Sequence, residues 1–175
     1  PENRDDPENL SNILSGLRKI ASNGMRLLLP VHPGTMKCIQ EAGLAARFDL
    51  IPSEDKRDGL SFIEPVGYLD MIQLERCAYA IFTDSGGIQK EAFLLKVPCI
   101  TLRNETEWVE TISAGWNILS GADTDRITDA FSIVSGWNRT GPPFPNPNNS
   151  SNPTNPFGDG RAAEKIVEYL KEAIT

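Results

Sequence analysis

The amino-acid sequence predicts an α/β domain with a doubly wound, mostly parallel sheet. Short apolar runs alternate with segments of helical periodicity along most of the 175 residues. The apolar runs lack a strict polar–apolar alternation, which is typical of strands buried on both faces of a parallel sheet. Two adjacent glycines, Gly86 and Gly87, directly follow one of these runs. We therefore expect ligands to bind beyond the carboxyl ends of the strands.

In the first part of the chain, Asp6 followed by Pro7 is a good N-cap and first-turn pair for a helix whose apolar residues recur at helical spacing. The short run from Arg26 to Val31 reads as a strand that ends in a turn around His32. The predicted elements here are a helix at 7–22, a strand at 26–31, a helix ending near 43, a polar interval at 53–59, a strand at 61–64 and a helix at 68–77.

The second part continues the alternation up to a segment rich in Pro and Asn. The predicted elements are a strand at 80–83, a helix led by Gly86, a strand at 98–102, a helix at 106–114, a strand at 117–120 and a helix at 124–134. A loop at about 138–156 follows, and a final helix at about 159–174, with Asp159 as its expected N-cap and an apolar stripe on one face.

Length and composition limit the classes of protein to which the chain can belong. With 39% hydrophobic and 23% charged residues, the chain reads as one globular domain spanning 1–175. A net charge of −7 without a basic cluster argues against nucleic-acid or acidic-membrane partners. The three cysteines and the single histidine fit neither a disulfide framework nor a metal site, so we expect no metal, no cofactor and a cytoplasmic location.

The junction after the 80–83 strand is the strongest functional signal. Ser85, Gly86 and Gly87 leave backbone N–H groups uncovered at a helix N-terminus, where an anion such as a phosphate is favoured. Glu91 follows within the same helix, near enough for its carboxylate to accept hydrogen bonds from a diol such as a ribose. The same junction also occurs where a helix packs closely on a sheet, so the motif alone leaves binding and packing equally open.

Longer segments resemble the non-hydrolysing UDP-N-acetylglucosamine 2-epimerases. The resemblance is carried by the stretches at 2–10, 68–71, 83–92, 101–110 and 157–163, and it covers nearly the whole chain. It implies the Rossmann-like carboxyl-terminal domain of a two-domain enzyme of glycosyltransferase-B architecture, without the amino-terminal domain. The parent enzyme would interconvert UDP-N-acetylglucosamine and UDP-N-acetylmannosamine by eliminating UDP and adding it back.

The resemblance also implies a division of labour. The carboxylates that move the C2 proton would lie on the absent domain, so no catalytic residue is assigned to this chain and the chain alone is expected to be inactive. The departing UDP would be held here, with Ser85, Gly86 and Gly87 at the phosphates and Glu91 at the ribose. Met71 aligns with a position bordering the uracil, although a plain core methionine is an equal interpretation. The parent is expected to be a homodimer and this chain a monomer.

Two further positions, Arg103 and His32, keep two interpretations each. Arg103 would pair either with phosphate or with a neighbouring carboxylate such as Glu107, and the structural pairing is the better expectation. Some relatives carry an arginine where this chain has Trp108, so the resemblance does not carry over a phosphate contact at that position. His32 lies where bacterial relatives build a second, regulatory UDP-sugar site, but a structural histidine at a turn is the safer interpretation.

Two other functions compete with an epimerase domain. A UDP-sugar glycosyltransferase of the same architecture also places a diglycine turn and a downstream glutamate at the nucleotide, and transfer to an acceptor would distinguish it. A nucleotide-binding regulatory module would bind UDP with micromolar affinity on its own.

Overall fold

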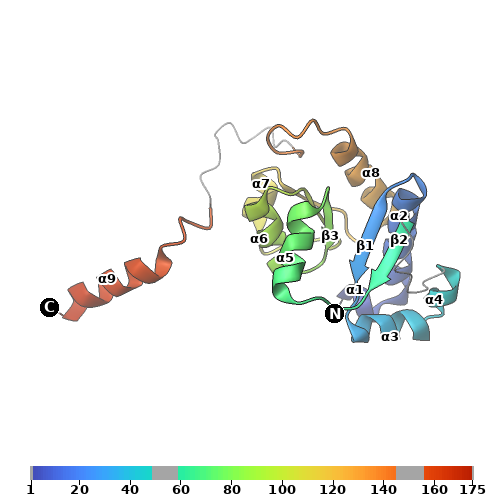
Figure 1. The fold of residues 1–175 in the computed structure, drawn as a ribbon, viewed down its shortest axis with the longest axis horizontal. Coiled ribbons are helices and arrows are strands. Elements are labelled where there is room, and N and C mark those ends of the chain that lie inside the picture. The colour runs from blue at the N-terminus through green and yellow to red at the C-terminus, as the bar shows by residue number, and fades with distance from the viewer. Residues whose placement is uncertain (1, 49–58, 145–155, 175) are drawn as a thin grey trace.

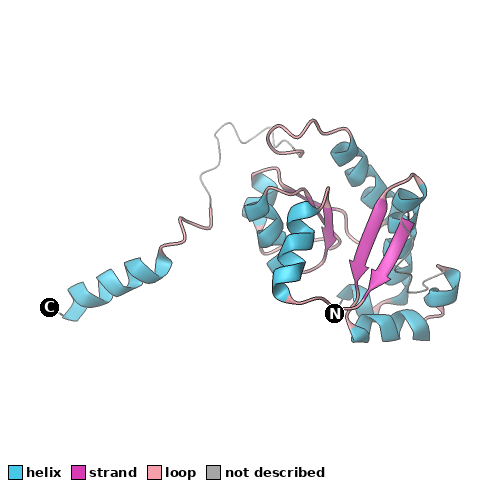
Figure 2. Ribbon diagram, in the orientation of Figure 1, coloured by secondary structure: helices cyan, strands magenta, loops and turns pink. Residues whose placement is uncertain are grey.

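The computed structural model describes residues 2–48, 59–144 and 156–174. Its strand pairs are all parallel, which confirms the predicted α/β class. The strands are β1 (Arg26–Pro30), β2 (Gly59–Ile63), β3 (Ile81–Thr83), β4 (Cys99–Thr101) and β5 (Asn117–Leu119). Figure 2 shows them between helices.

The described strands form two hydrogen-bonded groups, whereas the sequence led us to expect one sheet. β1 pairs with β2, and β3, β4 and β5 pair in that order. Between the groups lies a cavity of about 780 Å³, lined by residues of β1, β3, α2 and the helix that precedes β3. In the described part of the chain, this cavity therefore separates β1 from β3, and the two strands share no backbone ladder.

Helices follow the strands in the expected order, apart from two short ones that were not predicted, α1 and α4. Their bounds are α1 (Glu2–Asp5), α2 (Pro7–Ser22), α3 (Pro33–Glu41), α4 (Leu44–Arg47), α5 (Tyr68–Cys77), α6 (Gly86–Leu95), α7 (Val109–Ser113), α8 (Thr124–Ser135) and α9 (Ala162–Ile174). None of these helices is long and apolar enough to cross a bilayer.

Helices cover both faces of the β3–β4–β5 group. Consecutive residues of a strand point to opposite faces, and in β4 the buried Cys99 packs in a cluster with Ala92 of α6. Its neighbour Ile100 packs with Ala130 and Val134 of α8. This arrangement is the doubly wound layering that the alternation of elements predicted.

The apolar residues that recur at helical spacing along α2 are buried, as the periodicity predicts, and α2 packs closely against α8. A Cβ atom on Gly16 would lie 3.0 Å from Ile127 Cγ2, so the absence of a side chain permits the close approach. Asn3 of α1 is buried and donates to the carbonyl oxygen of Leu102 at 2.6 Å, which ties the start of the chain to the end of β4.

Two helices start later than predicted. The helix expected at 106–114 is shortened to α7, because the Thr106 side chain accepts from the Trp108 N–H at 3.0 Å and so stabilises a turn. The final helix begins at Ala162 rather than about 159, and Asp159 accepts from the Arg161 N–H at 3.0 Å just ahead of it. Most of the loop expected at 138–156 lies outside the described residues.

Figure 1 shows α9 apart from the rest of the described chain. Its predicted apolar stripe is present on the helix but does not pack: Ile166, Val167 and Leu170 are 58%, 49% and 56% exposed. The periodicity thus predicted the helix correctly, without showing where its apolar face lies.

Candidate functional site

The junction between β3 and α6 has the geometry that the sequence predicted. Thr83 ends β3, and its hydroxyl oxygen accepts from the Ser85 N–H at 3.0 Å, which fixes the turn. Ser85 is the N-cap residue of α6 but makes no side-chain capping hydrogen bond. The first turn of α6 therefore keeps its N–H groups free of a local cap, at the positive end of a ten-residue helix.

A loop from the end of β4 crosses this helix end and brings a carboxylate to it. A Cβ atom on Gly86 would overlap Glu107 Oε1 and would lie 2.9 Å from Trp108 Nε1. A side chain at 86 would therefore displace Glu107 and press against Trp108, whereas glycine leaves both side chains in place. The start of α6 thus has a carboxylate of the protein itself, that of Glu107, beside it.

Arg103 holds this carboxylate from the other side. Its guanidinium Nη1 lies 3.1 Å from Glu107 Oε2, so the pairing with a carboxylate expected from the sequence is present. The Glu107 backbone N–H holds the pKa of this carboxyl below its usual value; burial acts in the opposite direction, and Arg103 adds to the lowering. Because the Glu107 side chain is 48% exposed, it can leave the helix end without opening the core.

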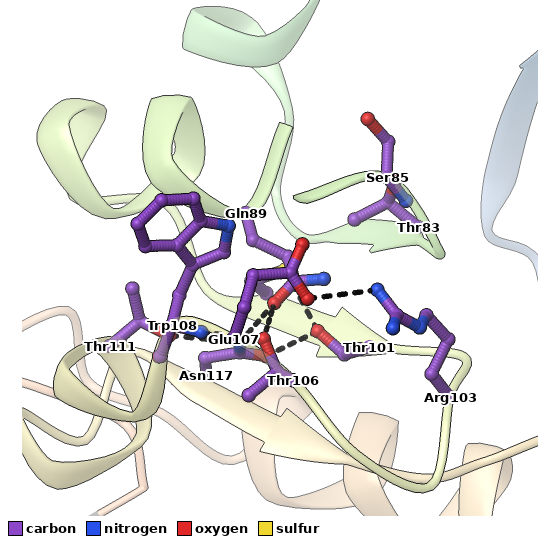
Figure 3. Close-up of polar contacts among 11 residues, drawn as sticks. Thr83, Ser85, Gln89, Thr101, Arg103, Thr106, Glu107, Trp108, Thr111 and Asn117 are labelled. Carbon is purple, nitrogen blue, oxygen red and sulfur yellow. Dashed lines mark hydrogen bonds and ion pairs between the residues drawn. The ribbon is translucent and has the colours of Figure 1, made fainter. Parts of the chain in front are cut away.

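A buried polar network fixes the loop against α6 (Figure 3). The Gln89 side-chain oxygen accepts from Thr106 Oγ1 at 2.6 Å and from Asn117 Nδ2 at 3.3 Å. Asn117 of β5 also accepts from Thr101 Oγ1 at 2.8 Å and donates to Thr111 Oγ1 at 3.0 Å. The network joins α6, β4, β5, α7 and the loop, so the start of α6 and the loop above it are held as one unit.

Two buried N–H donors of this unit, Gln89 Nε2 and Trp108 Nε1, meet no acceptor among the described residues. Trp108 is held from its other side, since the Lys90 ammonium lies 4.0 Å from its ring centroid and Phe157 contacts it edge-on at 6.0 Å. The donors and Arg103 make the surroundings of the α6 terminus favourable for negative charge.

The remaining candidates lie around this centre. Met71 lines the same cavity as Ser85, on the side of α5. Glu91 is half-buried on α6, and its charge and then hydrogen bonding with it raise the pKa of the Tyr68 phenol. His32 also lines the cavity, but its Nδ1 accepts from the Gly34 N–H at 3.1 Å and caps α3.

The structure thus brings Ser85, Gly86, Arg103 and Glu107 together, with Gly87 on the same turn. Sequence reasoning missed Gln89, Thr106 and Asn117, which position this centre, and Glu75, which is buried beside Glu91. Polar residues such as Asn117 and Thr101 within short apolar strands were the available signal, because a buried polar group needs a partner.

The sequence matches the family described as UDP-N-acetylglucosamine 2-epimerase over residues 1–171. It is 44% identical over 97% of the chain to a UDP-N-acetylglucosamine 2-epimerase homolog of Methanococcus maripaludis. It is 36% identical, again over 97%, to a UDP-2,3-diacetamido-2,3-dideoxy-D-glucuronate 2-epimerase of Pseudomonas aeruginosa. The chain spans 42% and 41% of the length of these two relatives.

Solved structures agree with this match. The Methanocaldococcus jannaschii UDP-GlcNAc 2-epimerase in complex with UDP-GlcNAc and UDP superposes with a TM-score of 0.79 at 38% identity, covering 98% of this chain and 42% of that one. The Neisseria meningitidis enzyme bound to UDP-GlcNAc gives 0.74 at 29% identity, covering 98% and 42%. The fold, the diglycine junction and the extent of the match together show that this chain belongs to the UDP-N-acetylglucosamine 2-epimerase family.

Proposed function

We propose that this domain binds the UDP portion of a UDP-N-acetylhexosamine. In this proposal the protein interconverts UDP-N-acetylglucosamine and UDP-N-acetylmannosamine by elimination and re-addition of UDP. The chemistry at the sugar C2 would be supplied by residues outside this chain, which spans 42% of the relative it matches at 44% identity. This chain would hold the leaving group and supply no base.

One observation carries the proposal: α6 begins with an N-terminus that lacks a side-chain cap, and the Glu107 carboxylate that lies over it is paired with Arg103. A pyrophosphate that displaced the Glu107 carboxylate would gain the N–H groups at Gly86 and Gly87 and the Ser85 hydroxyl, which makes no capping hydrogen bond. Arg103 is already beside that position, so it would exchange one anion for another without moving far.

The named relatives support UDP as the shared ligand. The Methanococcus maripaludis relative is named for UDP-N-acetylglucosamine and the Pseudomonas aeruginosa relative for a UDP-linked diacetamido-glucuronate. The sugars in these names differ whereas the nucleotide does not, and both relatives match nearly the whole of this chain. A domain common to both is therefore best suited to the nucleotide.

The same geometry would serve elimination as well as binding. Negative charge grows on the leaving pyrophosphate as the C1–O bond breaks, and fixed N–H donors stabilise that charge without reorganising. Glu91, five positions after Gly86, would accept hydrogen bonds from the ribose and keep UDP oriented for re-addition. The cytoplasmic location is also part of the proposal, which the free thiols of Cys38, Cys77 and Cys99 support.

Titration calorimetry with the full chain tests the nucleotide part of the proposal. UDP should bind at least about a hundredfold more tightly than uridine, because uridine lacks the phosphates that α6 and Arg103 would contact. Glu91→Gln should weaken UDP and uridine by the same factor, since it acts on the ribose that both share.

Equal affinity for UDP and uridine would contradict a phosphate site at α6. A Glu91→Gln variant that weakens neither ligand would contradict the ribose role. The epimerase activity needs its own measurement, C2 deuterium incorporation into UDP-N-acetylglucosamine in heavy water by the whole protein, and the domain with residues 1–175 alone should give none.

A further inference from the structure

Helix α5 presents one face toward α6. Tyr68, Met71 and Glu75 follow each other at spacings of three and four residues, so they lie along the same side of the helix. α5 and α6 are in contact along this side. Glu75, in the last turn of α5, is 3% exposed, which is rare for a glutamate without a cationic partner.

Both carboxyl oxygens of Glu75 are buried and meet no hydrogen-bond donor among the described residues. The polar group that faces them is the carboxyl of Glu91 on α6, which raises the pKa of Glu75 through its charge and through hydrogen bonding. Two ionised carboxylates have only acceptor oxygens. Such a pair forms a hydrogen bond when one member carries a proton.

No cation compensates this pair in the described part of the chain. None of its ion pairs includes Glu75 or Glu91. The nearby Lys90 on α6 lies over the Trp108 ring instead, and Arg76 on α5 is exposed. Two other titratable groups interact electrostatically with the pair: the Tyr68 phenol and the Cys99 thiol on β4. Burial, with a smaller contribution from Glu75, raises the pKa of Cys99 to about 12.

Burial first, and then Glu91, raises the pKa of Glu75 to about 7. An ionised carboxylate in this position would be both desolvated and next to a like charge, which is unfavourable. Below neutral pH, Glu75 is therefore the group in this pair that holds the proton.

We propose that Glu75 is a positioning residue for nucleotide binding: its protonated carboxyl donates a hydrogen bond to Glu91 and holds the Glu91 carboxylate as an acceptor for the ribose diol. This inference rests on the proposed function, because it assigns Glu91 to the ribose. Glu75 does not touch the ligand. It acts by fixing which oxygen of Glu91 is free and by keeping a single negative charge at the pair.

The proposal predicts a direction of pH dependence. Below about pH 6, Glu75 is protonated and the pair is ready to accept the ribose. As the pH rises through the pKa of about 7, Glu75 ionises, the hydrogen bond to Glu91 is lost and the two carboxylates repel each other. Affinity for the nucleotide therefore falls on the alkaline side.

The experiment measures the dissociation constant of UDP-N-acetylglucosamine with the full chain between about pH 5.5 and 8.5. This ligand is chosen because both of its phosphates are diesters, whereas the terminal phosphate of UDP titrates near pH 6. The wild-type affinity should fall about tenfold across the range, the size expected for loss of one hydrogen bond to a charged group.

Two variants and one control separate positioning from packing. Glu75→Gln keeps a donor for Glu91 but does not titrate, so it should bind as tightly as wild type at low pH and keep that affinity at high pH. Glu75→Leu removes the donor, so it should bind about tenfold more weakly at every pH. Gln73→Glu adds an exposed carboxylate to the same helix and should leave the wild-type pH profile unchanged.

A Glu75→Gln variant that keeps the wild-type pH profile would overturn the proposal, and so would a flat wild-type profile. If Glu91→Gln binds like wild type, the ribose assignment itself fails and this inference fails with it. A carbon-13 titration of the glutamate carboxyls in wild-type protein does not depend on any variant folding. One glutamate should titrate near neutral pH, and titration of all of them below about pH 5.5 would refute the protonated carboxyl.

Discussion

The N-termini of α6 and α8 make an instructive pair, because both helices follow strands of the same three-stranded group. At α8, Asp123 Oδ1 accepts from the N–H groups of Asp125 and Arg126 at 3.0 and 2.8 Å. At α6, the residue in the same position is Ser85, and its side chain makes no such bond. One helix end is closed by its own N-cap residue, and the other is left to a carboxylate from a separate loop.

Under the proposed function, this difference is what distinguishes a binding helix start from a structural one. A local cap such as Asp123 cannot leave, because it belongs to the backbone turn it stabilises. Glu107 comes from the loop after β4 and has Arg103 as a second partner, so it can be exchanged for an external anion. The α6 end therefore combines stability in the free protein with access for a ligand.

The largest effect is expected when α6 receives an aspartate N-cap residue like the one that caps α8. Ser85→Asp would place a carboxylate that accepts from the first N–H groups of α6 and repels phosphate. UDP affinity should fall by about a hundredfold, the size of losing one preorganised donor to an oxyanion, while the free energy of unfolding stays equal or rises. Calorimetry and urea denaturation measure the two quantities.

The reciprocal variant is the matched control. Asp123→Ser gives α8 the N-cap residue of α6, exchanging one good N-cap for another, so the free energy of unfolding should change by about 0.5 kcal/mol or less with UDP affinity unchanged. Unaltered UDP binding in Ser85→Asp would mean that the nucleotide does not use the α6 end.

A smaller effect is expected from removing the charge that now covers α6. Glu107→Gln keeps the shape of the side chain but no longer competes with phosphate for Arg103, so UDP affinity should rise about three- to tenfold at low salt. The neighbouring Glu110→Gln, on the exposed side of α7, should change affinity little. A fall in affinity for Glu107→Gln would show that this carboxylate assists the ligand.

The smallest effect concerns a third helix start, that of α3, which His32 caps. His32→Ala should lower the free energy of unfolding by about 1 kcal/mol through loss of this cap, and His32→Asn should restore it. Neither should alter the cooperativity of UDP-sugar turnover in the whole protein. A changed Hill coefficient with normal stability would instead support the regulatory interpretation of this histidine.

Local patterns in the sequence predicted a large share of the structure. The strand, the serine and the two glycines at 80–87 lie next to each other along the chain, so their junction and the open N-terminus of α6 could be inferred without tertiary information. The parallel α/β class and the Asp6 cap followed from equally local signals.

What could not be predicted depends on distant contacts. Glu107 reaches Gly86 because the loop after β4 folds back over α6, and Glu75 meets Glu91 because α5 packs on α6. The division of the strands into two groups, and the exposed apolar face of α9, likewise depend on how separate elements meet. Hydrophobic periodicity predicts the type of each element but not which other elements it packs against.

The main-chain character of the α6 terminus also bears on how such a protein tolerates mutation. Every residue except proline supplies a backbone N–H group, so most substitutions along this turn would leave the proposed anion contacts in place. Vulnerability is confined to positions where a new side chain would fill the space, as at Gly86, or compete for the donors, as at Ser85. The surrounding sequence can therefore change while the proposed nucleotide contacts are kept.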